Sequence, residues 1–188
     1  MKSLFTVVFL FALVAGVAAA ADASNPLLAS SSAFYGQMKD IVLRSAEKMP
    51  EADYSFRPTP EVRTYGGVLA HIADAQFLLC GIATDGKMVM KGYEKTAKTK
   101  AEIVAALQEG FAACDSVYQK LTDADAATMV SWFGQQRTKL SVLDFNIAHG
   151  FEHYGNLVTY MRIKGIVPPS SEPRKPAAAA APKPAETH

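Results

Sequence analysis

The chain has 188 residues, of which 49% are hydrophobic, and it carries a formal net charge of +1. This length and balance are typical of one globular domain with short appendages, and the near-neutral charge gives no indication of nucleic-acid binding. The expected partner is therefore a small-molecule substrate of unknown identity, with no nucleic acid.

The first 21 residues are predicted to be a secretory signal peptide. Lys2 precedes an apolar run from Leu4 to Val17, and small residues that offer A-x-A cleavage sites follow it. A transmembrane anchor is the alternative, but the apolar run is short and no cluster of charges follows it. We therefore expect a periplasmic or secreted protein, without stable membrane insertion, in a compartment where disulfides persist.

Residues 25–167 are predicted to form an all-α domain, a four-helix bundle. Apolar residues recur at helical spacing in four runs, whereas no stretch alternates convincingly with period two, so no strand is expected. The runs extend from Phe34 to Pro50, from Val68 to Ile82, from Ile103 to Leu121 and from Leu140 to Met161. Four amphipathic helices bury their apolar faces best against one another. The connections after the first and third runs are long, which leaves room for one that crosses the bundle.

Residues 168–188 are predicted to be a disordered tail. They consist almost entirely of Pro, Ala, Ser and charged residues, which cannot bury enough apolar surface to fold. A spacer that reaches the cell envelope is the functional alternative for this segment.

Three of the four histidines are predicted to face one site in the bundle. His149 and His153 lie four residues apart on the last helix, a spacing that lets one helix present two imidazoles to one ion. His71 lies about 70° from the centre of the apolar face of the second helix, so its side chain is directed toward the bundle. Three histidines that leave a coordination position open are a known catalytic arrangement. A core or capping role is the alternative for each histidine.

The segment from His149 to His153 also spells H-x-x-E-H, the zinc motif of inverted metalloproteases. Such a protease needs a glutamate ligand well downstream, and the only acids after the last helix are Glu172 and Glu186, both in the tail. The protease interpretation therefore fails. Glu152 lies about 100° round the helix from His153, so we expect it at the surface or behind the ligands. Other polar residues that could orient ligands or move protons are Asp74, Asn146, Tyr154 and Tyr160.

The two cysteines fall on the second and third helices. Cys80 is nine residues from His71, which places it roughly 13 Å away along the axis and on the opposite side, so it is not expected to touch the ion. A disulfide with Cys114 and a pair of core thiols both remain open, and an oxidising compartment would allow the disulfide.

Two segments carry a family resemblance. The stretches "FRPTPEVRTYGGVLAHIADAQFLLC" and "LDFNIAHGFEHYGNLVTYMRIKGIVPPSS" resemble the DinB/YfiT-like family of metalloenzymes, over about residues 30 to 171. The resemblance implies a four-helix bundle of up-down-down-up connectivity, frequently a homodimer, that binds a divalent ion such as zinc or nickel through three histidines. By motif position these are His71, His149 and His153. Some members of the family are thiol-dependent transferases or isomerases.

Two hypotheses about function follow from these residues. The first is an exported enzyme, a metal-dependent hydrolase or thiol-dependent transferase, whose three histidines hold a divalent ion with open positions. The second is a non-catalytic metal-binding or structural envelope protein. The catalytic residues and the substrate are not indicated by the sequence.

Overall fold

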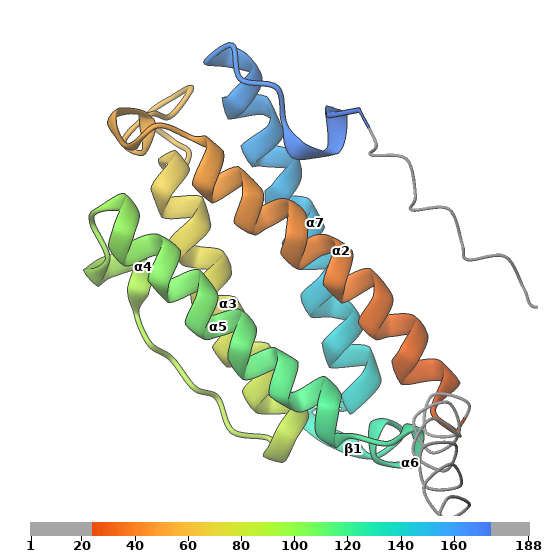
Figure 1. Ribbon diagram of the computed structural model, residues 1–188. Coiled ribbons are helices and arrows are strands. Elements are labelled where there is room, and N and C mark those ends of the chain that lie inside the picture. The colour runs from red at the N-terminus through yellow and green to blue at the C-terminus, as the bar shows by residue number, and fades with distance from the viewer. Residues whose placement is uncertain (1–23, 174–188) are drawn as a thin grey trace, which may run out of the picture.

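A computed structural model describes residues 24–173 as a bundle of four long helices joined by short elements (Figure 1). The long helices are α2 (Pro26–Lys48), α3 (Tyr65–Asp85), α5 (Lys100–Lys120) and α7 (Lys139–Ile163). The short elements are η1 (Glu51–Asp53), α4 (Tyr93–Thr96), α6 (Asp123–Ala126), β1 (Met129–Trp132), β2 (Gln135–Thr138) and η2 (Pro169–Ser171). The mostly helical architecture confirms the all-α prediction. The predicted signal peptide, residues 1–21, lies outside the described residues.

The long helices begin where side chains satisfy their first backbone N–H groups. Thr99 and Glu102 form a reciprocal capping box at the start of α5, and Thr64 and Thr138 cap α3 and α7. Helix α2 begins earlier than the predicted start at Phe34. Its first turns are rich in serine, which weakens the apolar periodicity there. They are capped by Asp123, from a distant part of the chain: its two carboxylate oxygens accept backbone N–H groups of α2, at 3.0 and 2.9 Å.

Helix α3 lies at the centre of the packing. It packs against α5 and α7, and α2 also packs against both of these helices. By length and hydropathy α3 alone of the described helices could cross a membrane, but 72% of its most apolar window is buried inside the bundle, as in a core helix. Helices α2 and α7 approach closely at Gly150, where a Cβ would lie 2.5 Å from the sulfur of Met38. A glycine at that position therefore allows the two helices to pack.

The cysteine pair joins two of these helices. Cys80 of α3 and Cys114 of α5 form a disulfide, with 5.4 Å between their Cα atoms, which decides between the two alternatives that the sequence left open. Beside it lies a fully buried pair of amides. The Gln76 side chain donates to Asn146 at 3.1 Å and accepts from it at 2.8 Å, which joins α3 to α7. The expectation that Cys80 lies in the core, away from the histidines, is therefore correct.

The crossing connection follows the second long helix, and not the first or the third, which connection length had indicated. Figure 1 shows α3 and α5 running in the same direction, so residues 86–99, between them, pass back along the outside of the bundle. The sequence placed the crossing after the first or the third helix, because those connections are also long. This route brings residues 86–99 against α3, next to the histidines.

A β-hairpin corrects the prediction that the chain contains no strand. Strands β1 and β2 pair antiparallel, with Trp132 opposite Gln135, between α6 and α7. Residues Phe133 and Gly134 form the two-residue turn, and both have positive φ, 47° and 80°. The pattern was missed because β2 has no buried residue to alternate with its polar ones.

Ordered contacts continue past the expected domain boundary at residue 167. Ser170 accepts a hydrogen bond from the hydroxyl of Tyr154 at 2.8 Å, and its backbone N–H donates to that hydroxyl at 2.9 Å. Glu172 pairs with Arg44 and Lys48 of α2. The first residues of the predicted tail, 168–173, therefore belong to the folded unit, and residues 174–188 lie outside the described part of the chain.

Candidate metal centre

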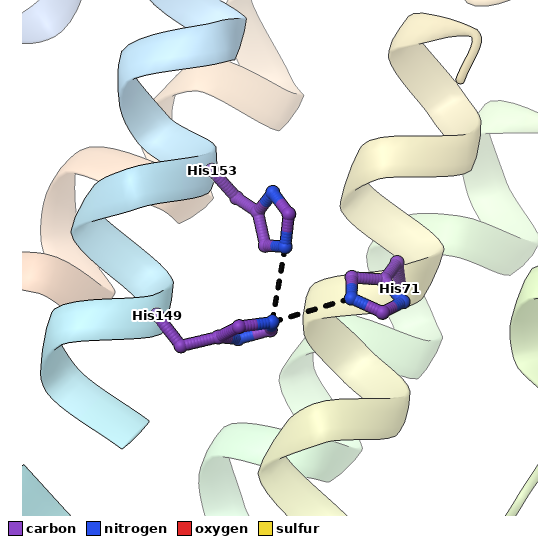
Figure 2. A group of neighbouring side chains, drawn as sticks. All are labelled: His71, His149 and His153. Atoms are coloured by element: carbon purple, nitrogen blue, oxygen red, sulfur yellow. Dashed lines mark hydrogen bonds between the residues drawn. The ribbon is translucent and has the colours of Figure 1, made fainter. Parts of the chain in front are cut away.

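The three predicted histidines converge in the space between α3 and α7. Figure 2 shows His149 and His153 reaching from successive turns of α7 toward His71 of α3. The Nε2 atom of His149 lies 3.2 Å from Nε2 of His71 and 3.0 Å from Nε2 of His153. The ligand nitrogens of all three lie within 4.8 Å of one another. The helical spacing of the sequence thus identified a real cluster.

The protons available in this cluster do not satisfy its nitrogens. Glu94 accepts a hydrogen bond from Nδ1 of His71 at 3.0 Å, which leaves the lone pair of His71 on Nε2, facing the other rings. Nε2 of His149 lies within hydrogen-bonding distance of both neighbours, but it carries at most one proton. A cation at the centre would accept all three lone pairs. Two imidazole nitrogens bound to one zinc lie about 3.4 Å apart, close to the two shortest separations here.

The electrostatic environment keeps the α7 histidines neutral. Burial, reinforced by the neighbouring His153 and His71, lowers the pKa of His149 to about 4. Burial and the proximity of His71 also lower the pKa of His153. Both imidazoles are therefore neutral at pH 7, so each has one ring nitrogen with a free lone pair, the form that binds metals.

Glu94 supports His71 from the crossing connection. One carboxylate oxygen pairs with Nδ1 of His71, and the other accepts from Nε of Arg63 at 2.7 Å. Burial alone would raise the pKa of Glu94, but the hydrogen bonds from Arg63 and His71 outweigh it and lower that pKa. An ionised carboxylate behind a histidine fixes its tautomer and raises its basicity, as is usual at metal sites.

Glu94 is a partner of the cluster that the sequence analysis missed. It is 23 positions from His71 and lies in a four-residue helix, so no periodic pattern connects the two. Asp74, one turn beyond His71, holds this short helix in place: its two carboxylate oxygens accept from the backbone N–H groups of Tyr93 and Glu94, at 2.9 and 3.0 Å. The available signal was Asp74 itself, an acid three residues from His71 that the sequence indicated as a residue able to orient ligands; it does so indirectly, by holding the helix that carries Glu94.

The other polar candidates lie around the site without touching the cluster centre. Asn146 is occupied by its buried pair with Gln76, and the hydroxyl of Tyr160 donates to the backbone oxygen of Arg63 at 2.9 Å. Tyr154 is buried and bound to Ser170, which agrees with the packing role expected for it. Glu152 is exposed on the surface of α7. None of these four side chains forms a hydrogen bond with a histidine of the cluster in the described structure.

A cavity of about 520 Å³ opens beside the cluster. His71 and His149 form part of its wall, and the remainder comes from α3, α7, the crossing connection and the β-hairpin. Its volume lies in the range of small-molecule sites. The site therefore combines a group of metal-ligating side chains with space for a ligand next to it.

Comparison with known proteins agrees with this architecture. The sequence profile of the DinB superfamily matches residues 35–157. A search among curated proteins finds no match. The fold is similar to that of a DinB-like protein from Bacillus subtilis, with a TM-score of 0.61, 18% identity and coverage of 75% of this chain and 92% of the other.

Two further solved structures share the fold. A DinB-like protein from Bacillus cereus has a TM-score of 0.62 at 19% identity, covering 72% of this chain and 91% of the other. The H52A mutant of a mycothiol-dependent maleylpyruvate isomerase has a TM-score of 0.57 at 12% identity, covering 69% of this chain and 60% of the other. At these identities the similarity establishes the fold.

Proposed function

The chain belongs to the DinB superfamily, and we propose that it binds one divalent metal ion through His71, His149 and His153 as an exported metal-dependent hydrolase or thiol-dependent transferase. The observation that carries the proposal is the convergence of three imidazole nitrogens, two of them on histidines with lowered pKa, beside a cavity. Zinc or nickel is the proposed ion, because imidazole suits both. An ion held by three neutral histidines keeps positions open to ligands and acts as a Lewis acid.

Different residues of the chain would bind the ion, orient its ligands and surround the substrate. The three histidines supply neutral donors, and Glu94 holds the ring of His71 in the orientation and tautomer that direct Nε2 to the centre. Arg63 keeps Glu94 ionised. The mostly apolar wall of the cavity would exclude water from a ligand bound there, which strengthens electrostatic interactions.

Two observations bear on the choice between hydrolase and transferase. A solved structure of similar fold is a mycothiol-dependent isomerase, which favours thiol chemistry. The predicted export favours hydrolysis, because thiol cofactors of this kind are expected in the cytosol. The disulfide between Cys80 and Cys114 supports the proposed export, since such bonds persist in oxidising compartments. The family connectivity, up-down-down-up, is supported by the helix directions in Figure 1.

Metal analysis of protein purified without a histidine tag tests the proposal first. We expect one equivalent of metal in the wild type and none in the His71→Ala, His149→Ala and His153→Ala variants, with helical content unchanged because the disulfide and the buried helix faces stabilise the core. Glu152→Gln is the matched control: Glu152 lies inside the H-x-x-E-H motif but is exposed, so its metal content should equal that of the wild type.

Activity separates the enzyme from the alternative, a non-catalytic metal-binding or structural protein. The zinc and nickel forms are assayed against activated esters, amides and thiol-accepting electrophiles, beside the His149→Ala variant. Metal-dependent turnover that the variant lacks supports the enzyme. Equal rates for both proteins, with metal confirmed in the wild type, favour the non-catalytic role, and unfolding of the histidine variants indicates a structural ion.

A further inference from the structure

The cavity beside the histidines has an uneven distribution of polar groups. Apart from its histidine end, its wall is mostly apolar and includes Leu78, Leu79 and Met90. Two carboxylates line the cavity, and both already have hydrogen-bond partners within the protein. Glu94 pairs with Arg63 and His71, and Asp74 accepts two backbone N–H groups. A cationic ligand would therefore find no free acid among the lining residues, whereas a carboxylate or carbonyl fits a metal-bearing end.

Four rings form an aromatic row that leads from the hairpin tip to the cluster. The centroids of Phe133 and Trp132 are 5.9 Å apart, those of Trp132 and Phe145 are 4.6 Å apart, and those of Phe145 and His149 are 6.1 Å apart. All four residues line the cavity. A ligand that approaches His149 through this cavity thus passes along aromatic surface, which favours an apolar or aromatic body.

Phe133 is an unfavourable residue for its place in the fold. Its φ of 47° is rare for a bulky side chain, and the turn that it forms with Gly134 strongly prefers Asn at this position. The side chain is also 65% exposed, so burial does not compensate for the backbone strain. Backbone outliers of this kind cluster at active sites, ligand clamps and switch regions.

We propose that the aromatic row, with Phe133 at its outer end, is the specificity-determining wall of the cavity. The ligand class that it fits is a small molecule with an apolar, preferably aromatic, body and one carboxylate or carbonyl head directed at the three histidines. This assignment rests on the proposed function, because the head requires a metal ion at the histidine end.

Trp132 provides a direct measurement of binding, because it is the only tryptophan in the chain. The zinc-loaded protein is titrated with acetate, butyrate, hexanoate and phenylacetate while Trp132 fluorescence is recorded. We expect affinity to rise about fourfold for each CH₂ group that enters the cavity, with phenylacetate bound far more tightly than acetate. The Phe133→Asn variant, which suits the turn, should bind phenylacetate about tenfold more weakly and acetate equally well.

Met129→Thr is the matched control on the same hairpin. Met129 is also exposed, but it does not line the cavity, so this variant should keep the wild-type affinities. Equal affinities for acetate and phenylacetate, or the same loss in both variants, would overturn the assignment. Failure of the proposed function has a different signature: zinc does not bind, while phenylacetate still binds better than acetate and Phe133→Asn still weakens it.

Discussion

The two sides of the cavity are built in different ways. The inner side belongs to α3 and α7, which are held together by the buried Gln76–Asn146 pair and joined to α5 by a disulfide. The outer side consists of the crossing connection and the hairpin, where large apolar residues remain exposed, such as Met90 and Phe133. The inner side therefore fixes the positions of the metal ligands, while the outer side determines what a ligand contacts. Changes on the inner side should cost stability, and changes on the outer side should alter binding.

The largest expected effect tests the rigidity of the inner side. Replacing both Cys80 and Cys114 by alanine removes a bridge across a sequence separation of 34, which should lower the free energy of unfolding by about 4 kcal/mol. Denaturant unfolding of wild type and variant measures this difference. Metal affinity of the folded variant should change little, because neither cysteine touches the cluster. A loss of metal at unchanged fold would show that the bridge positions the histidines.

The second prediction concerns Glu94, through which the outer side supports a metal ligand. Glu94→Gln removes the charge behind His71, and loss of such a partner typically costs 10–100-fold in metal affinity, or about 1.4–2.7 kcal/mol. Competition with a chelator measures the affinity. Glu109→Gln is the control, because Glu109 pairs with Lys91 and Tyr93 of the same connection but not with a histidine. Equal losses in the two variants would mean that the connection acts only through its overall packing.

The third prediction follows from the lowered pKa of His149 in the metal-free protein. The pKa of His149 is about 4 in the folded state and about 6.5 in the unfolded state, so between these values the unfolded chain binds more protons. The stability contribution of neutral His149 is complete above pH 6.5 and is lost as the pH falls toward 4. After allowance for solvent screening we expect a loss of about 1–2 kcal/mol over this interval. Chemical denaturation at a series of pH values measures it, and His149→Gln should flatten the curve. An unchanged slope in that variant would assign the pH dependence to other groups.

The same contrast between the two sides explains what could be predicted from the sequence. The inner side could be predicted because its sequence is periodic. The spacing of His149 and His153, and the placement of His71 on an apolar helix, follow from helical geometry. The role of Glu94 could not be predicted, because its contact with His71 depends on the route of residues 86–99. The lengths of the connections had indicated a crossing elsewhere in the bundle. The hairpin was hidden because Phe133 stands where Asn would normally signal its turn. The contact of Ser170 with Tyr154 was hidden by a proline-rich composition that usually indicates disorder.

The smallest expected effect concerns Phe133 and gives the clearest separation of stability from binding. Asn tolerates positive φ far better than Phe, so Phe133→Asn should stabilise the protein by about 0.5–1 kcal/mol even though it removes a large side chain. Thermal unfolding compares this variant with wild type. Phe133→Ala is the control: it removes the same ring without gaining Asn's tolerance of the turn, so it should be less stable than Phe133→Asn. If Phe133→Asn instead destabilises the protein, the ring contributes to packing at the hairpin tip. The strain would then have a structural cause and would no longer indicate a ligand contact for Phe133.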